Sequence, residues 1–214
     1  MDYSATVAWA GAAAGYLAGS IPFGLLLARL VGVDVRKVGS GNIGATNVFR
    51  INKGLGVLAF LLDALKGFAP AFAARWVAGA PEWLGLAWGA AAVAGHNWPL
   101  WLGFKGGKGV STSVGMLLGV APAAAGIGLG VFAVTVVATR WVSLGSILAA
   151  AAVAGCAWWL YGSGQPPVVA WALTVLAALV ILRHWKNILR LLHGTEPKII
   201  PKKSSSGTAG APPA

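Results

Sequence analysis

VSTSVGMLLGVAPAAAGIGLGVFAVTVVAT, residues 110–139, decides how this chain is folded. These thirty residues carry no charge, and they can form one long membrane-spanning helix or two shorter helices that meet near Ala121-Pro122. About 20 residues cross a bilayer core, so length alone does not choose between them. The choice determines on which side of the membrane every later loop lies.

The distribution of basic residues favours two helices, because Lys and Arg gather on the cytoplasmic side of membrane proteins. A single crossing would leave the basic run that begins at Arg183 outside. If the chain turns at Pro122, fourteen of the sixteen Lys and Arg residues lie at or beyond the cytoplasmic ends, and only Lys66 and Arg75 do not. The sequence therefore predicts an all-α integral membrane protein with seven transmembrane helices, N-terminus out and C-terminus in.

The seven predicted segments are 5–31, 54–78, 82–95, 110–120, 122–139, 142–161 and 166–183. Segments 82–95 and 110–120 are too short to span alone, so they require neighbours and can bring helix ends to a ligand. Pro22 is expected to kink the first segment, and Gly11, Gly15 and Gly19 permit close packing. Residues 1–200 are predicted to form one domain, followed by a disordered tail at 201–214.

The composition argues against a soluble protein and against a nucleic-acid-binding protein. The chain has 214 residues, 57% hydrophobic and 10% charged, whereas soluble domains carry about 25% charged residues. Its net charge of +11 is explained by membrane orientation, so we expect membrane lipids and no nucleic acid as partners, and a monomer. The single Cys156 excludes an intrachain disulfide, and no metal or other cofactor is expected.

The longest polar interruption is GHNWPLWLGFKGGKGVST, residues 95–112. Glycines free backbone N–H groups for a ligand, and Lys105, Lys108 and a helix starting at Val110 add positive charge, which predicts a phosphate site. It is not a P-loop, because Gly109 stands where Ser or Thr should follow Lys108. A basic connector resting on anionic headgroups remains an alternative. His96 is a base or an orienting residue.

Two further loops and the last segment carry similar chemistry. GSGNIGATNVFR, residues 39–50, contains G-x-G-x-x-G but follows a transmembrane helix, so a dinucleotide fold is rejected. Its polar side chains suit phosphate, although a turn-rich loop has the same composition. TRWVSLGSI, residues 139–147, places Ser143 and Ser146 on one helix face. RHWKNILRLLHGTEPKI, from residue 183, places His184 and Asn187 on one helix face. The alternative for this stretch is a basic amphipathic helix that lies on lipid headgroups.

Asp63 and Lys66 are expected to neutralise each other within the second segment.

In order and spacing, these four motifs resemble the bacterial acyl-phosphate:glycerol-3-phosphate acyltransferases, the PlsY family, over roughly residues 5–200. The resemblance implies a bundle of seven transmembrane helices in the bacterial inner membrane, with its active site facing the cytoplasm. It implies transfer of a fatty acyl group from acyl phosphate to the sn-1 hydroxyl of glycerol 3-phosphate, giving lysophosphatidic acid and phosphate. This is the first step of phospholipid synthesis. A transporter of a phosphorylated solute is the alternative, although the loops cluster at one face.

The site residues expected on these grounds fall into three groups. The catalytic group is Ser40, Asn42, Arg50, Lys108, Ser143, His184 and Asn187. The phosphate-binding group is Gly41, Gly44, Thr46, Asn47, Gly106, Gly107, Gly109, Ser111, Thr112 and Ser146. His96, Asn97, Asp63 and Lys66 are expected to support them. No Ser-His-Asp set is evident and no acid is counted within the motif loops, so we expect either a histidine or the donor's own phosphate to accept the proton.

Overall fold

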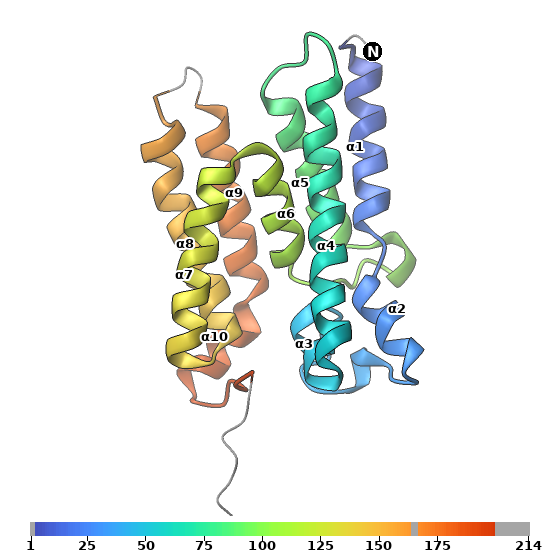
Figure 1. Cartoon of the computed structure of the whole chain (residues 1–214), viewed down its shortest axis with the longest axis vertical. Coiled ribbons are helices and arrows are strands. Elements are labelled where there is room, and N and C mark those ends of the chain that lie inside the picture. The colour runs from blue at the N-terminus through green and yellow to red at the C-terminus, as the bar shows by residue number, and fades with distance from the viewer. Residues whose placement is uncertain (1–2, 164–166, 200–214) are drawn as a thin grey trace, which may run out of the picture.

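In a computed structural model, which describes residues 3–163 and 167–199, the regular elements are helices (Figure 1). The predicted tail at 201–214 lies outside the described residues. The α-helices are α1 (Ala5–Gly19), α2 (Phe23–Leu30), α3 (Ala45–Ile51), α4 (Lys53–Ala73), α5 (Trp83–Asn97), α6 (Val110–Val120), α7 (Pro122–Thr139), α8 (Val142–Tyr161), α9 (Val168–Arg183) and α10 (Trp185–Leu192). Three short 3₁₀ helices are η1 (Val35–Lys37), η2 (Ala74–Trp76) and η3 (Leu100–Leu102).

The stretch at 110–139 forms two helices that meet at Ala121. Helix α6 ends at Val120, and α7 begins at Pro122. Proline suits a first helical position, because its ring presets φ and the missing N–H would have had no partner in the helix. The predicted break at Ala121-Pro122 is therefore confirmed. Pro22 has a stronger effect than the expected kink, because α1 ends at Gly19 and α2 starts afresh at Phe23.

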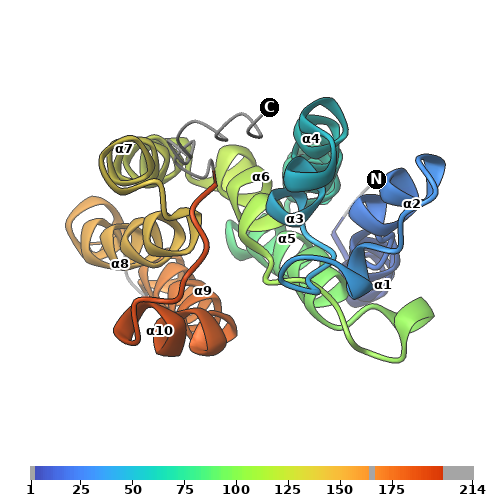
Figure 2. The ribbon, with the colours of Figure 1, turned by 90° about the horizontal axis from the view of Figure 1, so that it is seen from below.

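The helices form two groups, α1–α6 and α7–α10, which stand side by side (Figure 2). Glycines let the helices of the first group approach closely, as predicted for the first segment. A Cβ on Gly19 of α1 would lie 2.1 Å from the Ala92 carbonyl oxygen of α5. On α6, a Cβ on Gly115 would lie 1.8 Å from the Ala64 carbonyl oxygen of α4. Small residues at such contacts hold helices together where apolar burial from water is absent.

Four stretches of helix are long and apolar enough to cross a membrane: Ala5–Leu30, Lys53–Trp76, Pro122–Thr139 and Val142–Tyr161. Helices α9 and α10, bent by 57° at their junction, count as a fifth if taken together. Large apolar side chains such as Val134 and Val137 remain 71% and 83% exposed, as expected for a surface that faces lipid. At about 1.5 Å per residue, the eleven residues of α6 reach only about half-way across a core of about 30 Å.

Helices lie within all seven predicted segments, of which four, or five with α9 and α10 taken together, are long and apolar enough to cross a membrane, and two neighbouring regions are refined. Helix α5 runs to Asn97, so His96 and Asn97 belong to its last turn rather than to the following loop. The region 32–53, expected to be a polar loop, contains η1 and α3. Helices α2, α3 and α10 lie at the same end of the bundle, the lower end in Figure 1. This arrangement brings the three predicted loops and the last motif to one end.

Candidate active site

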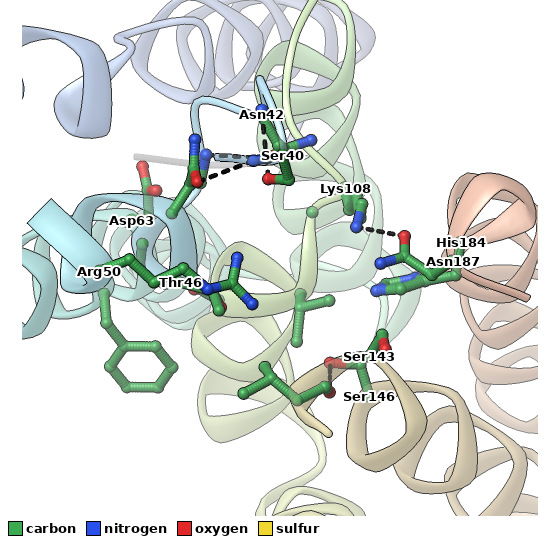
Figure 3. Close-up of a pocket in the computed structure, with 18 of the residues that line it drawn as sticks. Ser40, Asn42, Thr46, Arg50, Asp63, Lys108, Ser143, Ser146, His184 and Asn187 are labelled. Atoms are coloured by element: carbon green, nitrogen blue, oxygen red, sulfur yellow. Dashed lines mark hydrogen bonds between the residues drawn. The ribbon is translucent and has the colours of Figure 1, made fainter. Parts of the chain in front are cut away.

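A cavity lies at that end, between the two groups of helices (Figure 3). Its empty volume is about 790 Å³, including the open mouth. It receives side chains from α3 and the loop before it, from the start of α6, from the start of α8, and from the α9–α10 junction with the segment that follows α10. These are the four motif regions that the sequence singled out.

The cavity gathers most of the predicted site residues. All seven predicted catalytic residues line it: Ser40, Asn42, Arg50, Lys108, Ser143, His184 and Asn187. So do Gly44, Thr46, Asn47, Gly109, Ser111 and Ser146 from the phosphate-binding set, and Asp63 and His96 from the supporting set. The predicted residues that do not line it are Gly41, Gly106, Gly107, Thr112, Asn97 and Lys66.

The loop before α3 is shaped by the buried side chain of Asn47. Its amide nitrogen donates to the carbonyl oxygens of Val35 (3.0 Å) and Val38 (2.9 Å), and its oxygen accepts from the Ser40 N–H at 3.1 Å. The polar atoms of Asn47 are thus engaged in holding the loop. Ser40 and Asn42, which the loop carries, face the cavity.

Arg50 lies in the last turn of α3 and points into the cavity (Figure 3). One terminal nitrogen donates to the Pro197 carbonyl oxygen at 3.3 Å, while Nε has no partner among the described residues. Burial lowers the pKa of Arg50 from its usual value. An arginine nevertheless stays charged at neutral pH. A partly desolvated guanidinium with a free donor is suited to bind an anion.

The glycine-rich loop folds back on the end of α5. The N–H of Gly106 donates to the Asn97 carbonyl oxygen (3.2 Å), and that of Gly107 donates to the His96 carbonyl oxygen (3.0 Å). Gly109 has φ +78°, and a Cβ there would lie 2.8 Å from Asn97 Oδ1. Only glycine meets both conditions without strain. The amides of Gly106 and Gly107, expected to face a phosphate, are therefore already bonded within the protein.

Lys108 reaches across the cavity from this loop. Its Nζ donates to Asn187 Oδ1 at 2.5 Å (Figure 3). Burial lowers the pKa of Lys108 to about 8, and the nearby cations Arg190, Arg50 and Arg183 act in the same direction, against the opposing effect of Glu196. The ammonium is thus charged at neutral pH but loses its proton more readily than an exposed lysine.

Asn187 is held in turn by Glu196, a residue that the sequence reasoning did not place in the site. Asn187 Nδ2 donates to Glu196 Oε1 at 2.6 Å, and Arg190 Nε donates to Glu196 Oε2 at 2.7 Å. Burial alone would raise the pKa of Glu196, but the donors around its carboxylate make the net shift downward. The expectation that no acid lies within the motif loops is wrong, because Glu196 belongs to the last motif. One signal was available: Glu196 is the only acid after Glu82, and it lies within the basic run that begins at Arg183.

The segment that follows α10 and contains Glu196 runs between the two groups of helices (Figure 2), and Glu196 and Pro197 line the cavity. Trp141 Nε1 donates to the Glu196 carbonyl oxygen at 3.2 Å, and the Ile199 N–H donates to the Arg140 carbonyl oxygen at 2.9 Å. With the contact from Arg50 to Pro197, these bonds tie the segment to α3 and to the start of α8. The chain thus runs from α10 to the side of the cavity that is formed by α3 and the start of α8.

His184 is buried at the junction of α9 and α10. Its Nδ1 lies 2.7 Å from the Val180 carbonyl oxygen, which can only accept, so Nδ1 carries the proton and Nε2 keeps a free lone pair. Burial lowers the pKa of His184 to about 4, and the neighbouring Lys108 adds to this effect. At neutral pH the ring is uncharged, so it can accept a hydrogen bond but is a weak base.

Ser143 and Ser146 occupy the first turns of α8. Ser146 Oγ donates to the Val142 carbonyl oxygen at 2.9 Å. The hydroxyl of Ser143, which also lines the cavity, has no hydrogen bond of good geometry among the described residues, although it lies near the Glu196 carboxylate and helps to lower the pKa of that group. Of the two serines, Ser143 therefore has the hydroxyl available to a ligand.

Beneath the cavity, the predicted pairing of Asp63 with Lys66 is confirmed. Asp63 Oδ1 lies 2.6 Å from Lys66 Nζ, which also donates to the Ile21 carbonyl oxygen at 2.7 Å, in the break between α1 and α2. Both side chains are buried. His96 Nδ1 approaches the same carboxylate oxygen at 3.6 Å. A Cβ on Gly107 would lie 2.0 Å from His96 Nε2, so the imidazole packs directly under the glycine-rich loop.

A second, apolar groove adjoins the polar cavity. Phe60, Val110, Phe132 and Ser146 line both spaces. The groove continues away from the polar end between α6, α7, α8 and α9, past Leu117, Ala125 and Val153. Val110 and Leu117 of α6 are seven residues apart, which corresponds to a depth of about 10 Å at 1.5 Å per residue. A ligand with a charged head and an apolar tail fits such a pair of spaces.

Comparison with known proteins identifies the family. The family model described as "Glycerol-3-phosphate acyltransferase" matches residues 9–194. The chain belongs to the glycerol-3-phosphate acyltransferase family. Glycerol-3-phosphate acyltransferase from Anaeromyxobacter dehalogenans (strain 2CP-C) is 52% identical over 192 residues, covering 87% of this chain and 94% of that protein. The Geobacter sulfurreducens protein of the same name is 46% identical over 185 residues, with 86% and 93% covered.

Two solved structures of a family member share the fold. They are crystal structures of PlsY, an integral membrane glycerol 3-phosphate acyltransferase, in its glycerol 3-phosphate form and its lysophosphatidic acid form. They match with TM-scores of 0.83 and 0.80 and sequence identities of 44% and 43%, each covering 90% of this chain and 95% of that chain. This chain is therefore a multi-pass membrane acyltransferase of the glycerol-3-phosphate acyltransferase family, and the resemblance that its motifs indicated is confirmed.

Proposed function

We propose that this chain transfers a fatty acyl group from acyl phosphate to the sn-1 hydroxyl of glycerol 3-phosphate, releasing lysophosphatidic acid and inorganic phosphate. The observation that carries the proposal is the continuity of the cationic cavity with the apolar groove. Phosphates suit a space lined by Arg50 and Lys108, and an acyl chain suits a groove of alkyl and aromatic side chains. The solved PlsY structures, in glycerol 3-phosphate and lysophosphatidic acid forms, support the choice of acceptor and product.

In this proposal Arg50 and Lys108 hold the phosphates, assisted by Ser40, Asn42 and the backbone amides at the start of α6. Helix α6 contributes the positive end of its dipole there. The hydroxyl of Ser143 donates to an oxygen that gains charge in the transition state. Asn187, fixed by Glu196 and Lys108, and His184 position the acceptor.

The reaction forms one bond and breaks one. The sn-1 hydroxyl oxygen attacks the acyl carbonyl carbon, the bond from that carbon to the phosphate oxygen breaks, and inorganic phosphate leaves with the proton. With a pKa of about 4, His184 is a weak base at neutral pH, whereas the phosphate oxygen released as the C–O bond breaks gains negative charge and can take the proton. We assign proton acceptance to the donor's phosphate. His184 Nε2 accepts a hydrogen bond from the other hydroxyl of glycerol 3-phosphate, which positions the acceptor and leaves the proton of the sn-1 hydroxyl free to move to the phosphate.

We also propose the finer topology. All seven segments α1–α2, α4, α5, α6, α7, α8 and α9 enter the bilayer, with the N-terminus outside and the cavity at the cytoplasmic face of the inner membrane. The support is the excess of Lys and Arg at the cavity end of the bundle. Helices α5 and α6 do not cross alone but lie against α4 and each other. We propose that the chain works as a monomer, because the described residues of one chain line both cavity and groove.

A direct assay tests the activity. Protein purified in detergent is given acyl phosphate and glycerol 3-phosphate, and free phosphate and lysophosphatidic acid are measured together. Equal amounts of both products are expected. Phosphate without lysophosphatidic acid would indicate hydrolysis, and no product from a folded protein would reject the proposal. A cavity at one end of the bundle gives no support to the alternative of a transporter.

A further inference from the structure

Arg183, in the last turn of α9, contacts the glycine-rich loop from outside the cavity. Its Nη2 donates to the Gly107 carbonyl oxygen at 2.6 Å, and its Nε donates to the same oxygen at 3.2 Å. The same Nη2 lies 3.4 Å from the Gly106 carbonyl oxygen and 3.3 Å from that of Asn97. The guanidinium carbon also stands 5.5 Å from the centre of the Trp98 ring. One side chain thus binds three carbonyls of the loop and its anchor.

These contacts fix which way the loop's peptide groups face. In a planar trans peptide the C=O and N–H bonds point in opposite directions. Because the Gly107 carbonyl points toward Arg183, the N–H of Lys108 in the same peptide group points away from it. No partner is recorded for that N–H within residues 3–163 and 167–199, nor for those of Gly109, Val110 and Ser111.

The pattern of free and bonded amides coincides with the cavity wall. Lys108, Gly109, Val110 and Ser111 line the cavity, whereas Gly106 and Gly107, whose amides are bonded to α5, do not. The loop therefore has two faces. The Gly106 and Gly107 carbonyls are bound by Arg183 on one face, and the residues that carry the unpaired N–H groups line the cavity on the other. Successive backbone N–H groups without internal partners can form an anion-binding concavity.

We propose that Arg183 is a positioning residue, which holds the Gly106 and Gly107 carbonyls away from the cavity and so keeps the amides of Lys108–Ser111 turned toward a substrate phosphate. This rests on the proposed function. Glycine peptides rotate easily, and a released carbonyl would present a partial negative charge to the phosphate. Since Arg183 precedes His184, the same contact also fixes the loop relative to the α9–α10 junction.

The test compares Arg183→Lys and Arg183→Gln with Lys186→Gln. Lysine keeps the charge but lacks the planar fork that binds several carbonyls together. Lys186 is an exposed cation one turn further on that does not line the cavity, so its loss controls for net charge. KM for glycerol 3-phosphate, KM for acyl phosphate and kcat are measured separately, with the unfolding temperature of each variant.

We expect KM for one of the two phosphate substrates to rise about tenfold or more in both Arg183 variants, with the other KM within about twofold. The substrate affected identifies which phosphate the loop holds. Lys186→Gln should leave both constants unchanged. Arg183→Lys with both KM values at the wild-type level would overturn the proposal, because charge alone would then suffice. Equal increases in both would also overturn it, since they indicate general damage.

Equilibrium binding separates this inference from the proposed activity. Glycerol 3-phosphate and inorganic phosphate are titrated into wild-type protein and Arg183→Lys in the absence of an acyl donor. If wild-type protein binds phosphate but releases none from acyl phosphate, the proposed activity fails while the comparison of affinities still tests Arg183. Weaker binding by Arg183→Lys supports the positioning role, and equal binding rejects it.

Discussion

Lys108 Nζ and Asn187 Oδ1 meet at 2.5 Å, although 79 positions separate the two residues in the chain. Lys108 comes from the loop between α5 and α6, and Asn187 comes from α10, so the bond joins the two groups of helices across the cavity. Asn187 in turn donates a hydrogen bond to Glu196. Because one N–H of the Lys108 ammonium is bonded to Asn187, the orientation of the other two is restricted before a substrate binds.

Replacing Lys108 by Met should lower kcat/KM by about 100-fold or more, because a desolvated cation facing a phosphate is lost while the alkyl chain remains. Loss of a single charge-stabilising donor typically costs about 2.7–4 kcal/mol in the transition state. Lys105→Met is the matched control, since Lys105 is exposed in the same loop and does not line the cavity. Phosphate release measures both variants. Near-normal turnover by a folded Lys108→Met protein would remove Lys108 from the site.

The pKa of about 8 for Lys108 predicts a pH dependence. The cationic form binds phosphate and is lost as pH rises through this pKa. KM for the phosphate substrate that Lys108 holds should therefore be nearly flat from pH 7 to 7.5 and should increase steadily above pH 8. Arg stays charged over this range, so Lys108→Arg should show no such rise, whatever its absolute activity. A parallel rise in Lys108→Arg would assign the titration to another group.

The positions of the helices followed from sequence, because apolar length, proline and basic residues have local effects, and most residues proposed for the site came from the four motifs. What the sequence could not supply was pairing between distant residues. Nothing local distinguishes Arg183, which binds loop carbonyls, from Lys186, which is exposed. Gly106, Gly107 and Gly109 are the same residue type in one loop, but the N–H groups of Gly106 and Gly107 are hydrogen-bonded to carbonyls at the end of α5. Glu196 is brought to Asn187 by a turn after α10 that no periodicity indicates.

His184→Gln should retain measurable turnover at saturating substrate. If the donor phosphate accepts the proton, the imidazole contributes only a hydrogen bond, and glutamine can replace an acceptor at that distance in part. We expect kcat to fall by about 10- to 100-fold, in keeping with a loss of one positioning contact of about 1.4–2.7 kcal/mol. Single-turnover phosphate release gives the rate. Complete loss with substrate binding intact would instead make His184 the general base.

Replacing either Asp63 or Lys66 alone should destabilise the protein more than replacing both together. Breaking a buried ion pair by removing one partner typically costs about 3–5 kcal/mol, whereas replacing both with apolar groups is often nearly neutral. Asp63→Leu and Lys66→Met should each lower the unfolding temperature in detergent, and the double variant should recover part of the loss. Because Lys66 also binds the Ile21 carbonyl oxygen, recovery should be incomplete. Additive losses in the double variant would contradict a direct pairing.

The apolar groove predicts a switch in acyl-chain preference from a single glycine. Gly128 on α7 lines the groove, and its Cβ would lie 2.9 Å from Val153 Cγ2, whereas Gly130 two residues later has open space around it. Gly128→Leu should therefore fill the groove, and Gly130→Leu should add the same side chain outside it. With acyl phosphates of increasing length, Gly128→Leu should lose kcat/KM for long chains about tenfold more than for short ones, with KM for glycerol 3-phosphate unchanged. Gly130→Leu should keep the wild-type profile. An equal loss at every chain length in Gly128→Leu alone would place the acyl chain elsewhere.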